Sequence, residues 1–122
     1  MEDKPKKIFL ADDDEAIVDA TSMMLEMEGY SVAHTLDGNA VYEALLKGTD
    51  LLLLDIWMSG VDGRDVCRRL KADPLTREIP VLMISASREI RDSALASGAD
   101  DFLAKPFDLQ DLLDKISNLL LQ

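Results

Sequence analysis

Four short apolar segments of this chain each end at residues whose side chains can bind phosphate or a metal ion. A carboxylate can hold a divalent cation or form an acyl phosphate, and a lysine or a hydroxyl can contact a phosphoryl oxygen. This combination predicts metal-dependent phosphoryl chemistry. The polar residues are Asp12 and Asp13 after residues 7–11, Asp55 after 51–54, Ser85 after 81–84, and Lys105 after 101–104.

The elements that must position these side chains follow from the hydrophobic pattern. Apolar runs of four or five residues, with helical patterns between them, are typical of buried parallel strands. We predict an α/β fold, a (βα)5 doubly wound three-layer sandwich, whose ligands bind beyond the carboxyl ends of the strands. The predicted strands are 7–11, 31–34, 51–54, 81–84 and 101–104, and the predicted helices are 14–28, 40–47, 63–72, 89–97 and a last one from Asp108 onward.

Length and composition narrow the class of protein. The chain has 122 residues, which suits one domain, and we divide it into a charged tail over 1–6 and a domain over 7–122. A net charge of −11 argues against nucleic-acid binding. The single cysteine, Cys67, suits a reducing cytoplasm, and neither a signal peptide nor a membrane span is predicted.

The carboxylates at two of the strand ends predict a Mg²⁺ site. Three neighbouring carboxylates repel one another, and a hard cation that also binds a phosphate relieves the repulsion. Asp55 stands alone at a central strand end, so we favour it as the nucleophile. Asp12 and Asp13 are the better metal ligands, and Asp14 is assigned to capping the following helix. Asp108 is the predicted cap of the last helix.

The same residues carry a resemblance to a known family. From end to end the chain resembles the receiver domain of two-component response regulators, which implies a five-stranded parallel sheet of order 2-1-3-4-5. The resemblance also implies that the domain acts with a sensor histidine kinase or a histidine phosphotransfer protein. We expect a single-domain regulator without a catalytic output domain, because no segment follows the predicted last helix. The matching motifs are IFLADDD at 8–14, LDIWMSGVDG at 54–63, ISA at 84–86 and GADDFLAKPF at 98–107.

The resemblance also implies a role for each site residue. Asp55 accepts a phosphoryl group from a phosphohistidine. Asp13, Asp55 and the backbone carbonyl of Trp57 bind Mg²⁺, or alternatively Mn²⁺, while Asp12 acts mainly through water. Ser85 and Lys105 contact the phosphoryl oxygens.

Two further features follow from the same resemblance. Ser85 and Phe102 match the switch pair of the family, which implies that phosphorylation changes the surface formed by the fourth helix, the fifth strand and the fifth helix. The peptide bond between Lys105 and Pro106 is expected to be cis. An unknown downstream protein is expected to bind the surface of the fourth helix, fifth strand and fifth helix after phosphorylation has changed it.

The chain departs from the usual family pattern at two places that bear on function. Ser59 stands where proline is usual, and we expect this exchange to loosen the loop. The step from Ser85 to Gly98 is two residues shorter than usual, and the deficit falls either in the loop before the fourth helix or in the first turn of that helix. This puts the usual dimer contact through that face in doubt, and we expect a monomer or weak homodimer. Arg64, Arg68, Arg69 and Lys71 make the outer face of helix 63–72 basic, and we expect this face to be simply solvated, with a contribution to kinase docking as the less favoured alternative.

Other functions remain open at this level. The chain could be an interaction module that signals without phosphorylation, or a receiver excised from a longer response regulator or hybrid kinase. An aspartyl-phosphate phosphatase commonly has an acid two residues after its nucleophile, where this chain has Trp57. A flavin mononucleotide site would need a phosphate loop after the first strand, where three consecutive aspartates would repel the phosphate.

Overall fold

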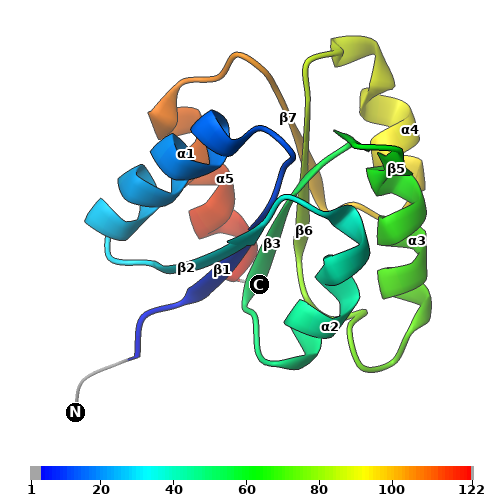
Figure 1. Cartoon of the computed structure of the whole chain (residues 1–122), viewed down its shortest axis with the longest axis horizontal. Coiled ribbons are helices and arrows are strands. Elements are labelled where there is room, and N and C mark those ends of the chain that lie inside the picture. The colour runs from blue at the N-terminus through cyan, green and yellow to red at the C-terminus, as the bar shows by residue number, and fades with distance from the viewer. Residues whose placement is uncertain (1–3, 122) are drawn as a thin grey trace.

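The computed structural model describes residues 4–121, in which a five-stranded parallel sheet is flanked by helices on both faces (Figure 1). The sheet order is β2-β1-β3-β6-β7, which is the predicted 2-1-3-4-5 order once the strands of the main sheet are counted along the chain. The strands of this sheet are β1 (Lys7–Ala11), β2 (Ser31–Thr35), β3 (Leu51–Asp55), β6 (Val81–Ser85) and β7 (Asp101–Ala104).

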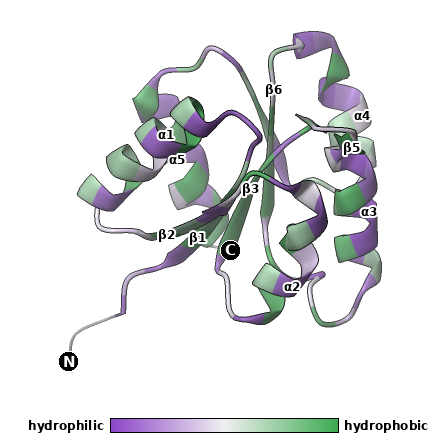
Figure 2. Cartoon of the chain, in the orientation of Figure 1, coloured by the Kyte–Doolittle hydropathy of each residue, from purple (hydrophilic) through white to green (hydrophobic). Residues whose placement is uncertain are grey.

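The helices divide into two layers, as the doubly wound prediction requires (Figure 1). One layer holds α1 (Glu15–Met27) and α5 (Leu109–Leu120), and the other holds α2 (Val41–Leu46), α3 (Gly63–Ala72) and α4 (Arg91–Ala96). Two apolar clusters fill the spaces between the sheet and these layers. In Figure 2 the central strands are accordingly hydrophobic, and the helices alternate hydrophobic and hydrophilic residues.

The central strand β3 shows why the sheet forms. Its residues Leu51–Asp55 are buried along their whole length, because β1 and β6 pair with it on both sides and helices cover both faces. A strand of this kind needs no polar alternation, which explains the unbroken leucine run. The burial of β3 fixes the position of Asp55 at its carboxyl end.

The helix boundaries follow local signals. The carboxylate of Asp14 accepts hydrogen bonds from the backbone N–H groups of Ala16 and Ile17, so its predicted capping role is confirmed. Asp108 occupies the cap position of α5, but its side chain makes no cap hydrogen bond. Short 3-10 turns precede α2 and α4, which leaves α4 six residues long.

One element was not predicted. After β3 the chain forms a small antiparallel hairpin of β4 (Trp57–Met58) and β5 (Val61–Asp62), which stands apart from the main sheet. Two residues in each strand are too few to show a period in the sequence. The hairpin lies directly beyond the carboxyl end of β3 and therefore borders the candidate site.

Part of the predicted tail lies outside the described residues. Residues 1–3 of the expected 1–6 tail belong to that part, while residues 4–6 lead into β1. No helix within residues 4–121 is long and apolar enough to cross a membrane.

Candidate functional site

The carboxyl edge of the sheet brings three aspartates together. Asp12 and Asp13 follow β1, and Asp55 is the last residue of the neighbouring strand β3. One carboxylate oxygen from each lies within 4.8 Å of the others. Asp12 and Asp55 are only 3% and 8% exposed, whereas Asp13 is exposed. The strand ends therefore converge as the sequence predicted.

Lys105 reaches this cluster from the end of β7. Its Nζ donates a hydrogen bond of 2.9 Å to Asp12 and lies 3.6 Å from Asp55. The backbone N–H of Lys105 also donates to the carbonyl of Ser85, which ties the ends of β6 and β7 together. The bond from Lys105 to Pro106 is cis, the isomer that the resemblance implies.

The cluster holds more negative charge than its one paired lysine balances. Burial, followed by the charge of Asp12, raises the pKa of Asp55 to about 6, although Lys105 opposes the shift. Burial alone would lower the pKa of Lys105, but its hydrogen bond to Asp12 and the charge of Asp55 raise it. The raised pKa of Lys105 favours its charged form, whereas the raised pKa of Asp55 means that its charged form is disfavoured by burial and by the neighbouring carboxylates.

This donor set fits a Mg²⁺ ion. The cluster offers hard carboxylate oxygens at a spacing that one cation can bridge, and among the described residues Lys105 is the one cation paired with them. Asp13 and Asp55 would hold the ion, with Asp12 nearby and partly neutralised by Lys105. Bound Mg²⁺ would supply positive charge to the carboxylates and to a phosphoryl group.

Gly63 is a site-shaping residue that sequence reasoning did not single out. A Cβ atom at this position would lie 2.7 Å from the backbone oxygen of Asp55 and 3.0 Å from the Cα of Ile56. The backbone N–H of Gly63 also donates to the carbonyl of Ile56. The start of α3 can therefore pack against the backbone of Asp55 only because residue 63 is glycine.

Ser59 behaves differently from the expectation. Its backbone N–H and its hydroxyl both donate to Oδ2 of Asp13, at 2.9 and 3.1 Å. The expectation of a looser loop overlooked these bonds, because the 46-residue separation hides the contact in the sequence. Ser59 instead ties the β4–β5 hairpin to the acidic cluster.

The basic residues of α3 are also more engaged than predicted. The guanidinium of Arg64 binds both carboxylate oxygens of Asp62, donates to the hydroxyl of Ser93 on α4, and lies 4.9 Å from the ring centroid of Trp57. Such a contact between a cation and an aromatic face is attractive. The expectation of a simply solvated face is therefore wrong for Arg64, which links the hairpin to α4.

The two predicted switch residues lie on neighbouring strands. Ser85 is the last residue of β6 and is almost fully buried, and its hydroxyl accepts a hydrogen bond from the backbone N–H of Ser87. Phe102 is a buried residue of β7 and pairs in register with Met83 of β6. Both side chains belong to the part of the sheet next to α4, which is where the predicted switch would act.

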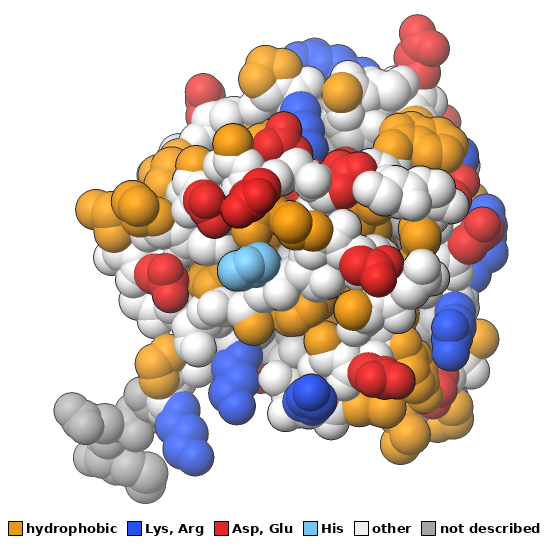
Figure 3. All heavy atoms as spheres, viewed as in Figure 1, with side chains coloured by type: hydrophobic (Ala, Val, Ile, Leu, Met, Phe, Trp, Pro, Cys, Tyr) orange, Lys and Arg blue, Asp and Glu red, His pale blue; other side chains and the backbone are white. Residues whose placement is uncertain are grey.

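On the face drawn in Figure 3, acidic side chains lie among hydrophobic, neutral and basic ones. A group of acidic side chains lies above the single histidine of the chain, His34, which is an exposed residue of β2. His34 pairs in register with Leu10 of β1, so it has the ordinary strand position that we expect for it. The site therefore combines buried and exposed negative charge.

The fold and the site together define a class: a doubly wound α/β domain with an acidic pocket at the carboxyl edge of its sheet. Residues 8–117 match the family model for the response regulator receiver domain. The chain belongs to this family of two-component signalling domains.

Curated relatives support the same assignment. The chain is 44% identical over 117 residues to a DNA-binding dual master transcriptional regulator, RpaA of Synechocystis, and 43% identical over 116 residues to the response regulator PleD of Caulobacter vibrioides. Each match covers 93% of this chain, but only 48% of RpaA and 26% of PleD. The chain thus spans about half or a quarter of the length of these relatives.

Solved structures match over nearly their whole length. A putative response regulator from Chloroflexus aurantiacus superposes with a TM-score of 0.92 at 30% identity, covering 98% of this chain and all of that one. The response regulator TrrA from Thermotoga maritima, solved in complex with Mg²⁺ and BeF, gives a TM-score of 0.85 at 25% identity, covering 93% of this chain and 98% of that one.

Proposed function

We propose that this domain is a Mg²⁺-dependent phosphoacceptor that takes a phosphoryl group from a phosphohistidine onto Asp55. The observation that carries the proposal is the environment of Asp55. This carboxylate is buried at the end of β3, crowded by Asp12 and Asp13, and paired only loosely with Lys105 at 3.6 Å. A carboxylate left with this much uncompensated charge is suited to chemistry rather than to stability.

The transfer is a displacement at phosphorus. An oxygen of ionised Asp55 forms a bond to phosphorus while the bond from phosphorus to the donor's imidazole nitrogen breaks, and the leaving imidazole takes up a proton. With a pKa of about 6, Asp55 is ionised by about ten to one at pH 7, so the nucleophile is available. The product is an acyl phosphate on Asp55.

Neighbouring side chains would stabilise the transferred group. Lys105, already beside Asp55, supplies an ammonium for one phosphoryl oxygen, and the hydroxyl of Ser85 supplies a donor for another. When Ser85 turns toward the phosphate it gives up its bond to the N–H of Ser87. The ring of Phe102 then repacks, and the surface of α4, β7 and α5 changes.

The family supplies the general class of partner. Receiver domains act with histidine kinases, and we propose a sensor kinase or a histidine phosphotransfer protein as the donor and an unidentified protein as the reader of the switched surface. The buried thiol of Cys67 suits a reducing compartment, so we assign the reaction to the cytoplasm. With α4 only six residues long, we propose a monomer or weak homodimer.

A fluoride analogue of the phosphoryl group tests the proposal. Adding BeF₃⁻ with Mg²⁺ should change the fluorescence of Trp57, which is the single tryptophan and lies two residues after Asp55. Asp55→Asn should abolish the response, whereas Glu26→Gln, which removes an exposed charge from α1, should keep it.

The same experiment separates the alternative. If the parent shows no fluorescence change and no amide shifts near Asp55, the chain is an interaction module that signals without phosphate. If Asp55→Asn responds like the parent, the assignment of the phosphoacceptor is wrong.

A further inference from the structure

The tip of the β4–β5 hairpin has an unusual backbone. Its two central residues, Ser59 and Gly60, have φ values of +35° and +82°. Two-residue hairpins favour turns with positive φ at both central positions, because these match the twist of the strands. A proline at position 59 would be held near −65° and could not form this turn.

The turn directs two donors at one carboxylate oxygen. The N–H and the hydroxyl of Ser59 both donate to Oδ2 of Asp13, across 46 residues of sequence. A proline has neither donor, so a chain with proline at this position could not make these bonds. Asp13 is exposed, and its side chain makes no hydrogen bond to residues 4–121 other than these two. The two bonds from Ser59 therefore hold its orientation.

We propose that Ser59 is a positioning residue that orients Asp13 for Mg²⁺. This inference rests on the proposed function, since it concerns the metal site of that function. Two bonds on Oδ2 leave Oδ1 of Asp13 without a hydrogen bond among residues 4–121. Outer partners of this kind hold a ligand in place before the metal arrives, and their removal commonly weakens metal affinity by about 10- to 100-fold.

Two substitutions separate the hydroxyl from the backbone. Ser59→Ala keeps the N–H and loses the hydroxyl, and Ser59→Gly loses the hydroxyl while adopting a positive φ more easily. Because only one of the two donors is lost, each should weaken Mg²⁺ binding by about three- to tenfold, which is less than the effect of removing a whole partner. Ser59→Pro loses both donors and should weaken binding further, by about tenfold or more.

The measurement is a Mg²⁺ titration followed by Trp57 fluorescence, with folding of each variant checked by circular dichroism. Ser31→Ala is the matched control, since Ser31 is an exposed serine at the start of β2, at the opposite end of the sheet from the acidic cluster. Its affinity should equal that of the parent. In an Asp13→Asn background, Ser59→Ala should have no further effect, because the carboxylate that it orients is gone.

The outcomes distinguish this inference from the proposed function. If the parent binds Mg²⁺ and both Ser59→Ala and Ser59→Gly bind as tightly or more tightly, Ser59 does not position Asp13, and the phosphoacceptor proposal stands. Tighter binding in both variants would mean that Ser59 competes with the metal for Asp13. If the parent binds no Mg²⁺, both proposals fail.

Discussion

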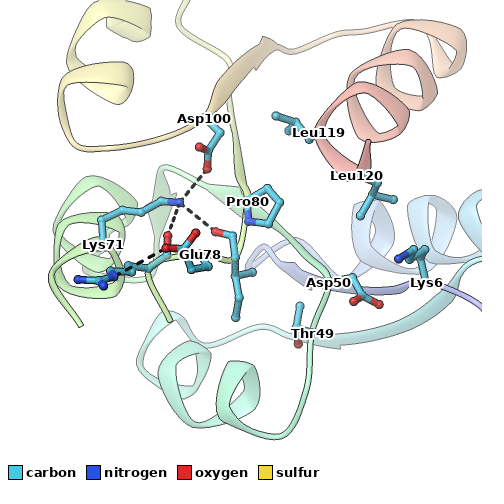
Figure 4. A pocket seen from close by; sticks show the side chains of 11 residues that line it. Lys6, Thr49, Asp50, Lys71, Glu78, Pro80, Asp100, Leu119 and Leu120 are labelled. Atoms are coloured by element: carbon cyan, nitrogen blue, oxygen red, sulfur yellow. Dashed lines mark hydrogen bonds and ion pairs between the residues drawn. The ribbon is translucent and has the colours of Figure 1, made fainter. Parts of the chain in front are cut away.

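The charged side chains at the two ends of the sheet differ in how completely they are paired. At the amino end, the Nζ of Lys71 donates to the carboxylate of Asp100 and to the carbonyls of Arg77 and Ile79, and the same oxygen of Asp100 accepts from the N–H of Val81 (Figure 4). At the carboxyl end, three carboxylates crowd one paired lysine, and the pKa of Asp55 is raised.

The difference separates stability from function. Charged groups with well-placed partners hold a structure together, whereas a group left short of partners costs stability and is available to a ligand. The pocket at the amino end is mixed in charge: Lys71 pairs with Asp100 (Figure 4), and Asp50 accepts a hydrogen bond from the backbone N–H of Lys7. The acidic cluster would be completed by a cation and a phosphoryl group.

The largest expected effect on stability comes from Lys105→Met at the carboxyl end. The substitution leaves the buried carboxylates of Asp12 and Asp55 without their cation, and the free energy of unfolding should fall by about 2 to 3 kcal/mol in EDTA. Urea denaturation measures the loss. Saturating Mg²⁺ should restore a large part of it, and an equal loss with and without Mg²⁺ would contradict the account of the cluster.

Asp55→Asn should stabilise the metal-free protein at neutral pH. The pKa of about 6 in the folded state lies above the ordinary value for an aspartate, so the native state binds the proton more tightly than the unfolded state, and ionised Asp55 costs stability. A difference of about two pKa units corresponds to about 3 kcal/mol, which solvent screening reduces to about 2 kcal/mol. The free energy of unfolding of the parent should therefore fall by about 2 kcal/mol between about pH 4 and pH 6 and stay at the lower value above pH 6. Urea denaturation at pH 4 and pH 7 checks the sign, and a variant that gains as much at pH 4 as at pH 7 would contradict the shift.

Lys71→Met probes the amino end. Without the ammonium, Asp100 and the carbonyls of Arg77 and Ile79 lose a hydrogen-bond donor. The free energy of unfolding should fall by about 1.5 kcal/mol, a modest loss because the pair is partly exposed to solvent. Mg²⁺ should stabilise Lys71→Met no more than it stabilises the parent, whereas it should stabilise Lys105→Met more than the parent. A variant rescued by Mg²⁺ would show that the two ends are coupled.

Much of the fold was predictable because its signals are local. The leucine run of 51–54 required a strand buried on both faces, and β3 is that strand. Gly29, Gly48 and Gly98 have positive φ at the ends of α1, α2 and α4, where the sequence placed the helix ends. The hairpin was missed because its strands are two residues long, although the Ser59-Gly60 pair is itself a turn signal.

The site was predictable only as far as strand ends position it. Asp12 and Asp55 meet because they lie at the ends of neighbouring parallel strands, and Lys105 reaches both of them from the end of β7, across β6. The bonds of Ser59 to Asp13 and of Arg64 to Ser93 depend on a turn conformation and on a contact between two helices. Neither is visible in residue types or spacing.

The central claim is that Asp55 accepts the phosphoryl group. It is tested most directly by incubating the domain with Mg²⁺ and a phosphorylated kinase, reducing any acyl phosphate with borohydride, and locating the resulting homoserine by mass spectrometry of the peptides. We expect conversion at Asp55 alone and none when Mg²⁺ is replaced by EDTA. Conversion at Asp12 or Asp13, or at no aspartate under conditions in which a known receiver is labelled, would contradict the account.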